Sequence, residues 1–202
     1  SIGYFARGEI EYNQGKTEEA IADYTRGLDI FPDHMESVGN RGNLYAKKGE
    51  YRRAIEDYNR AMALRPNDPK SYYNRGLAYF NLGELDKSVV DYAEAIRLKA
   101  DYTDAYLGRG KAYGKLKNYQ AAIADVETAL KIEPKHPETL NFSLMISHWK
   151  TMVASTAVSQ KLDTIEKCNE AIQLNPNNAS VYFARTLIYD KTKQTDLAIA
   201  DY

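Results

Sequence analysis

A short stretch of sequence returns along this chain at a fixed interval of 34 residues. The segment at 19–24 reads Glu-Ala-Ile-Ala-Asp-Tyr, and similar segments follow at 53–58, 87–92 and 121–126. A fifth copy, at 197–202, comes two periods plus eight residues after the fourth. A period of this length is typical of arrays in which each repeat is one small supersecondary unit. The repeats therefore fall at 1–34, 35–68, 69–102, 103–136, a longer one at 137–178 and an incomplete one at 179–202.

Each repeat has the pattern of two antiparallel helices. In the second repeat, small and apolar residues recur mostly at three- and four-residue intervals along 40–47 and again along 51–64. This is the period of an α-helix with one buried face. Gly49 lies between the two segments, where a helix end needs a residue that tolerates a left-handed backbone. Pro66 follows the second segment and prevents it from continuing as a helix. The sequence predicts an all-α fold.

Equivalent positions of successive repeats alternate between small and large residues. One column is glycine throughout the first four repeats, at Gly8, Gly42, Gly76 and Gly110. Small residues let helix axes approach to roughly 8–10 Å, and large side chains fill the spaces between them. Most of the 17 tyrosines fall in four columns of large residues. The excess of tyrosine is therefore explained by packing, with each ring buried and its hydroxyl reaching water or a neighbour.

Two further columns carry opposite charges. The arginine column contains Arg7, Arg41, Arg75, Arg109 and Arg185, and the aspartate column contains Asp23, Asp57, Asp91, Asp125 and Asp201. The fifth repeat lacks both residues, which suggests that the columns pair. We expect a ladder of Arg–Asp bridges between packed helices, because the guanidinium fork suits a carboxylate. The alternative is that the arginines face a groove and bind acidic partners.

These residues resemble the tetratricopeptide repeat, a helix–turn–helix unit of the same length. The match in the second repeat consists of Val38, Gly42, Tyr45, Ala54, Tyr58, Ala61 and Pro66. The resemblance implies a right-handed superhelical α-solenoid of antiparallel helix pairs, a single domain over 1–202. It also implies a concave face, lined by the first helices, that holds an extended peptide or a helix of a partner protein.

The chain departs from the family pattern at several points. Lys117 and Lys193 replace the glycine of the turn. The fifth repeat carries eight extra residues, about two helical turns. We expect either a longer first helix, from Pro137 to about Ala157, or a protruding loop around 153–161. This insertion is read either as a shaped binding surface or as a degenerate repeat.

First-helix residues outside the packing columns are the candidates for the groove. They are Phe5, Tyr12, Asn40, Asn43, Lys70, Tyr73, Asn74, Leu77, Phe80, Leu107 and Lys111. The apolar members would expose side chains that the fold does not need, which marks contact sites. Asn40 and Asn74 occupy equivalent slots and can donate to and accept from a peptide backbone. The alternative is that the aromatic residues pack within the solenoid and the asparagines are merely solvated.

Some family members hold the C-terminal carboxylate of a chaperone with lysine, asparagine and arginine side chains. The equivalent slots here carry Phe5, Glu9, Asn40, Lys70 and Asn74, and only Asn40 and Lys70 fit. Glu9 would repel a carboxylate. The resemblance therefore does not support this clamp in the present chain.

Composition excludes several other classes of protein. With Lys+Arg 27 and Asp+Glu 28, the net charge of -1 argues against a basic nucleic-acid binder. His34, His136, His148 and the single Cys168 have no metal-ligand spacing, and no phosphate-binding glycine motif is present. The least charged stretch contains Lys150, which a membrane span would have to bury. We expect no catalysis, no cofactor, no metal and no membrane span.

The sequence thus predicts a protein-interaction scaffold that binds a partner protein or peptide. A self-assembly or regulatory module of a larger protein is the alternative, and RNA binding is less favoured. The incomplete last repeat brings no polar capping helix, which leaves self-association through uncapped ends open. A single cysteine slightly favours the cytoplasm without fixing the compartment.

Overall fold

The computed structural model describes residues 2–138, 142, 145–154, 165–192 and 197, and all regular structure in these ranges is helical. The chain divides into two compact units, Ser1–His136 and Pro137–Tyr202. The first unit contains the four regular repeats, and the second contains the longer repeat and the incomplete one.

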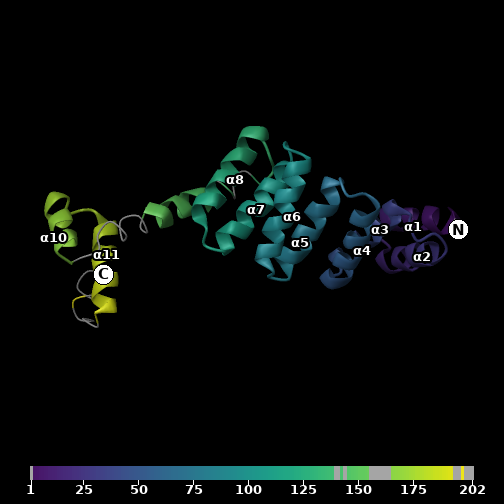
Figure 1. The fold of residues 1–202 in the computed structure, drawn as a ribbon, viewed down its shortest axis with the longest axis horizontal. Helices are drawn as coiled ribbons and strands as arrows, with labels where there is room; N and C mark the ends of the chain where they lie inside the picture. Colours follow the sequence, from purple (N-terminus) through teal and green to yellow (C-terminus); the bar gives the residue numbers. More distant parts are fainter. Residues whose placement is uncertain (1, 139–141, 143–144, 155–164, 193–196, 198–202) are drawn as a thin grey trace. The chain divides into compact units, whose positions relative to one another are not determined.

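The first unit consists of successive antiparallel helix pairs, one pair per repeat, as the sequence predicts (Figure 1). The two helices of each repeat pack against each other, and the second helix of each of the first three repeats packs against the first helix of the next, in the manner of a tetratricopeptide-like superhelix. The pairs are α1 (Ile2–Asn13) with α2 (Thr17–Ile30), α3 (Met35–Lys47) with α4 (Tyr51–Leu64), α5 (Pro69–Asn81) with α6 (Leu85–Leu98), and α7 (Thr103–Lys115) with α8 (Tyr119–Ile132).

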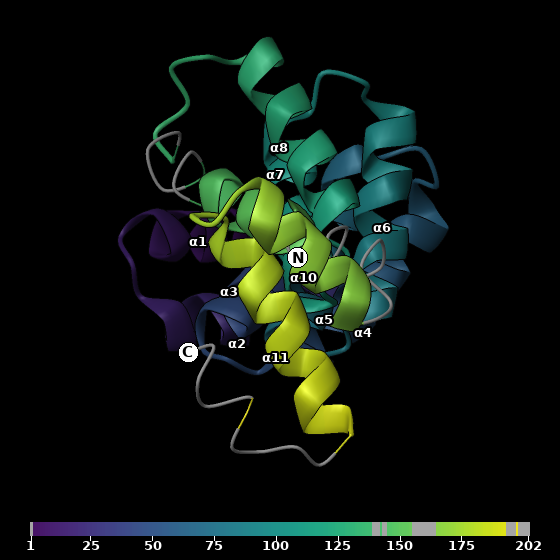
Figure 2. The same cartoon turned by 90° about the vertical axis from the view of Figure 1, so that its left-hand side faces the viewer.

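In the second unit, α10 (Ile165–Leu174) and α11 (Ala179–Lys191) pack side by side (Figure 2). Cys168, Val181 and Ala184 form the buried contact between them. Residues 145–154 are also helical. The predicted long helix does not begin at Pro137, because 137 and 138 lie in a turn. Of the alternative loop around 153–161, residues 153 and 154 are helical and the rest lie outside the described residues.

The glycine column and the tyrosine column meet inside each of the first three repeats. A Cβ atom on Gly42 would lie 2.9 Å from the Tyr58 ring, and one on Gly76 would lie 3.1 Å from the Tyr92 ring. Both rings are buried. The absence of a side chain on the first helix is therefore what admits the ring of the second, which confirms the packing predicted from the two columns.

The Arg–Asp ladder is present in all four regular repeats. Arg41 donates from Nε and Nη2 to the two carboxylate oxygens of Asp57, at 2.9 and 2.7 Å. The same two-pronged contact joins Arg7 to Asp23, Arg75 to Asp91 and Arg109 to Asp125. Each bridge connects the two helices of one repeat. The expected partner of Arg185, Asp201, lies outside the described residues.

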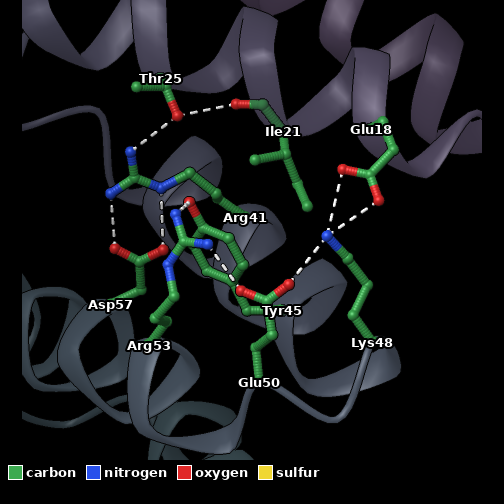
Figure 3. A network of polar contacts seen from close by, with 9 residues as sticks. All are labelled: Glu18, Ile21, Thr25, Arg41, Tyr45, Lys48, Glu50, Arg53 and Asp57. Carbon is green, nitrogen blue, oxygen red and sulfur yellow. Dashed lines mark hydrogen bonds and ion pairs between the residues drawn. The ribbon is translucent and has the colours of Figure 1, made fainter.

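The third guanidinium nitrogen extends the ladder between repeats. Arg41 donates from Nη1 to Thr25 Oγ1 at 3.1 Å, and Arg75 donates to Asn59 Oδ1 at 2.6 Å. Both acceptors belong to the second helix of the preceding repeat. Figure 3 shows the first of these links beside Arg53, whose guanidinium lies 4.0 Å from the centre of the Tyr45 ring. In the second and third repeats, one arginine therefore ties together three helices rather than two.

Replacing Lys117 by glycine is expected to stabilise the first unit by about 1 kcal/mol. Lys117 has φ 61°, in the left-handed region, where the equivalent residues are Gly49 and Gly83 with φ 78° and 77°. A side chain in this conformation costs about 1–2 kcal/mol, partly offset by the greater freedom of glycine in the unfolded chain. Urea denaturation followed by circular dichroism measures the change. The reverse substitution, Gly83→Lys, serves as the control and should lower stability. A lower stability for Lys117→Gly would contradict this account.

Candidate functional site

The first helices of three successive repeats line an open hollow of about 1080 Å³. α1, α3 and α5 contribute Phe5, Asn40, Asn43, Lys70 and Asn74, all of them predicted groove residues. The loop between α2 and α3 forms a further wall, whose residues were not among the predicted groove residues. The regular stacking of the repeats therefore gathers residues that are 34 positions apart onto one surface.

Two aromatic residues of that loop shape the wall. The His34 ring stacks on the Phe5 ring, with centroids 4.1 Å apart and planes inclined by 16°. His34 Nδ1 accepts a hydrogen bond from the backbone N–H of Ser37, which caps α3 and fixes the orientation of the imidazole. Phe31, at the end of α2, also lines the hollow and remains 50% exposed. The wall therefore presents aromatic surface to the hollow, held in place at His34 and accessible at Phe31.

Asn43 and Asn74 lie together in a hydrogen-bonded cluster with Tyr58. Asn43 Oδ1 accepts from the Tyr58 hydroxyl at 2.9 Å and from Asn74 Nδ2 at 3.0 Å. Burial raises the pKa of Tyr58 well above its ordinary value, so the hydroxyl stays protonated and donates. The amide N–H groups of Asn43 and the Oδ1 of Asn74 have no partner among the described residues. The cluster thus fixes two amides while leaving donors on one and an acceptor on the other.

The same cluster borders a second, smaller hollow of about 310 Å³. Asn43, Tyr58 and Asn74 line both, and Leu77 and Asn81 of α5 are among the other residues that line the smaller one. Leu77 is 40% exposed, in keeping with its predicted place on the surface. A partner segment that crossed the asparagine cluster would therefore meet apolar surface on both sides.

Charged residues around the larger hollow are mostly acidic. Four carboxylates, of Glu9, Asp33, Glu36 and Asp68, face two cations, Arg65 and Lys70. The first cation is paired, because Arg65 Nη2 lies 3.4 Å from Glu36 Oε1. A backbone hydrogen bond, with smaller contributions from His34 and Arg65, holds the pKa of Glu36 below its usual value. Asp68 accepts from the Ser71 N–H at 2.9 Å and caps α5.

Several predicted groove residues lie outside both hollows. The prediction that Leu107 lies on the groove surface is wrong, because its side chain is buried and only 4% exposed. It shares its register with Tyr73, which also packs back into the solenoid. The Tyr73 ring lies 5.7 Å from that of Tyr92 and 5.1 Å from that of Tyr102. The reading that aromatic residues pack within the solenoid therefore holds at Tyr73.

The remaining three lie nearer the surface. Tyr12 is exposed, and Lys111 is half-buried. Phe80 is also half-buried, and its ring is covered on one side by Lys115, whose Nζ lies 4.3 Å from the ring centre. None of the three lines either hollow.

Within the described ranges, no group of three or more His, Cys, Asp or Glu side chains is placed to hold a metal ion. Over the same part of the chain, no helix combines the length and the apolar character that a bilayer crossing needs.

Tetratricopeptide repeat models match residues 1–34, 42–83, 76–117, 103–136 and 167–200. No curated protein matched the chain.

Three solved structures show the extent of the likeness. The first TPR domain of human RPAP3 is 33% identical over 60% of this chain and 95% of its own, with a TM-score of 0.57. The first TPR of Spaghetti (RPAP3), bound to the HSP90 peptide SRMEEVD, is 32% identical over 59% of this chain and 93% of its own, with a TM-score of 0.56. MamA, 21% identical, covers 96% of this chain and 89% of its own with a TM-score of 0.61, and shows the fold alone. On the repeat matches, the chain belongs to the tetratricopeptide repeat family.

Proposed function

We propose that this chain is an interaction scaffold that holds an extended segment of a partner protein in the larger hollow, without catalysis. The observation that carries the proposal is the cluster of Asn43, Asn74 and Tyr58, which lines the open hollow with amide groups that have no partner among the described residues. Hydrogen-bonding groups of this kind, fixed at the centre of a concave apolar site, are the usual means of orienting a ligand.

The free groups of the cluster complement a peptide backbone. An extended peptide presents a carbonyl oxygen and an N–H at every residue. The Asn43 amide can donate to the carbonyl, and Asn74 Oδ1 can accept from the N–H. Such contacts hold a backbone without reading its side chains, so selectivity has to come from the surrounding walls.

The likeness to the RPAP3 domain that was solved with an HSP90 peptide supports a peptide as the occupant. It does not extend to a clamp for a terminal carboxylate. Phe5 and Glu9 occupy two of the slots that would need cationic or amide side chains, and both line the hollow. Like charges disfavour a carboxylate beside Glu9. The partner segment of this chain is therefore expected to differ from an acidic C-terminal tail.

Replacing Asn43 and Asn74 together by alanine is expected to weaken peptide binding about 30-fold. Two hydrogen bonds of about 1 kcal/mol each are lost, which corresponds to that ratio of dissociation constants. The probes are peptides selected on the unmodified protein from a random display library, with affinities measured by fluorescence anisotropy.

A matched variant, Asn67→Ala with Asn177→Ala, removes two exposed asparagines outside the hollow and should bind as the unmodified protein does. Thermal melts of both variants separate a loss of contact from a loss of fold. Unchanged affinity in a folded Asn43→Ala, Asn74→Ala variant would contradict the proposal.

A further inference from the structure

The larger hollow has a charge and a surface that fit one kind of partner segment better than others. We infer that it selects a basic segment, and that an arginine or lysine side chain of the partner lies against Phe5 and Phe31 beside the carboxylates of Glu9 and Asp33. This inference rests on the proposed function and names the partner that the same hollow takes.

Part of the negative charge around the larger hollow is not neutralised by neighbouring side chains. Glu9 and Asp33 are exposed, line the hollow and have no ion-pair or hydrogen-bond partner for their side chains in the part of the chain that the structure describes. Arg65 is paired with Glu36, so Lys70 is the remaining lining cation. The charge left for a ligand to meet is therefore negative on the side formed by α1 and the α2–α3 loop.

The same part of the hollow also presents aromatic rings. The exposed ring of Phe31 and the ring of Phe5 give an apolar wall. The His34 ring stacks on Phe5 and is held by its contact with the Ser37 N–H. Aromatic faces attract guanidinium and ammonium groups, and the aliphatic part of a long cationic side chain packs on apolar surface. An aromatic wall next to free carboxylates therefore suits arginine, and lysine second.

An acidic partner segment fits this hollow less well than a basic one. An acidic segment in this hollow would gain Lys70 and would approach Glu9 and Asp33 without compensation. The backbone contacts proposed for Asn43 and Asn74 are indifferent to this choice, because they involve no partner side chain. Charge selection and backbone binding therefore reside in different residues and can be tested separately.

The experiment uses the whole chain and peptides selected on it from a random display library. We expect the selected peptides to be enriched in arginine and lysine. Their affinity should fall as salt rises from low to physiological concentration. The double variant Glu9→Gln, Asp33→Asn should lower affinity about tenfold and reduce the salt dependence. The control Glu19→Gln, Glu56→Gln makes the same change of net charge at exposed acids outside the hollow and should leave affinity unchanged.

Each outcome decides between the two proposals. Acidic selected peptides would overturn the basic-segment inference. The same conclusion would follow if the peptides bound the Glu9→Gln, Asp33→Asn variant unchanged but lost affinity for the Asn43→Ala, Asn74→Ala variant. In both cases the proposed function would stand. Peptides insensitive to the asparagine variant would overturn the proposed backbone binding. Failure to select any binding peptide would overturn both.

Discussion

Replacing Asp57 by alanine is expected to destabilise the first unit by about 3–5 kcal/mol. Asp57 is buried and accepts two hydrogen bonds from Arg41, at 2.9 and 2.7 Å. The Arg41 side chain is itself only 15% exposed. Removing the carboxylate leaves a guanidinium charge in a poorly hydrated place, and that unpaired charge accounts for most of the loss.

Two comparison variants make the mechanism testable. Arg41→Leu with Asp57→Leu removes both charges and should cost much less than Asp57→Ala alone, since no unpaired charge remains. Glu56→Ala changes the neighbouring exposed acid on α4 and should stay within about 0.5 kcal/mol of the unmodified protein. Urea denaturation measures all three, and hydrogen exchange in α3 and α4 locates the change. A double variant as unstable as Asp57→Ala would show that packing, not charge, determines the effect.

The ladder could be predicted because one chain contains several copies of the same contact. Periodicity lines up the arginine and aspartate columns, and the fifth repeat loses both members together. The link from Arg41 to Thr25 was not predicted, because its acceptor is not the same residue in each repeat. Thr25 corresponds to Asn59 in the next repeat, and both have a side-chain oxygen that accepts. The two positions therefore share a hydrogen-bond acceptor rather than the same residue type.

The groove was predicted less well, for a different physical reason. Periodicity places a residue on a helix face. Whether a residue at the edge of that face is buried depends on the side chains of the neighbouring helix that contact it. Phe5 lines the hollow whereas Leu107, at the same register, is buried. The stack of Phe5 on His34 joins a helix to a distant loop, which no local pattern encodes. The exposure of Phe31 could have been predicted from the sequence, because the equivalent positions of the next two repeats carry charged residues, Arg65 and Lys99.

Tyr92→Ala is expected to destabilise the first unit by about 4 kcal/mol. The ring is 1% exposed and lies between two glycines, Gly76 of α5 and Gly108 of α7, with Tyr73 beside it. Neither glycine has a side chain that could move into the space, so the cavity would persist and add to the loss of buried apolar surface. Tyr92→Phe keeps the ring and should cost about 1 kcal/mol or less.

The geometry also predicts the sign of a coupling. A Cβ atom on Gly108 would lie 2.6 Å from the Tyr92 ring, so Gly108→Ala should destabilise the unmodified protein by forcing the ring aside. In the Tyr92→Ala background the obstacle is gone, and the added methyl group fills part of the cavity. Gly108→Ala should therefore cost less there, or stabilise. Urea denaturation of the four proteins of this cycle measures the coupling. Additive effects would mean that the ring does not occupy the space that Gly108 leaves, and that the tyrosine column is not held by its glycine neighbours.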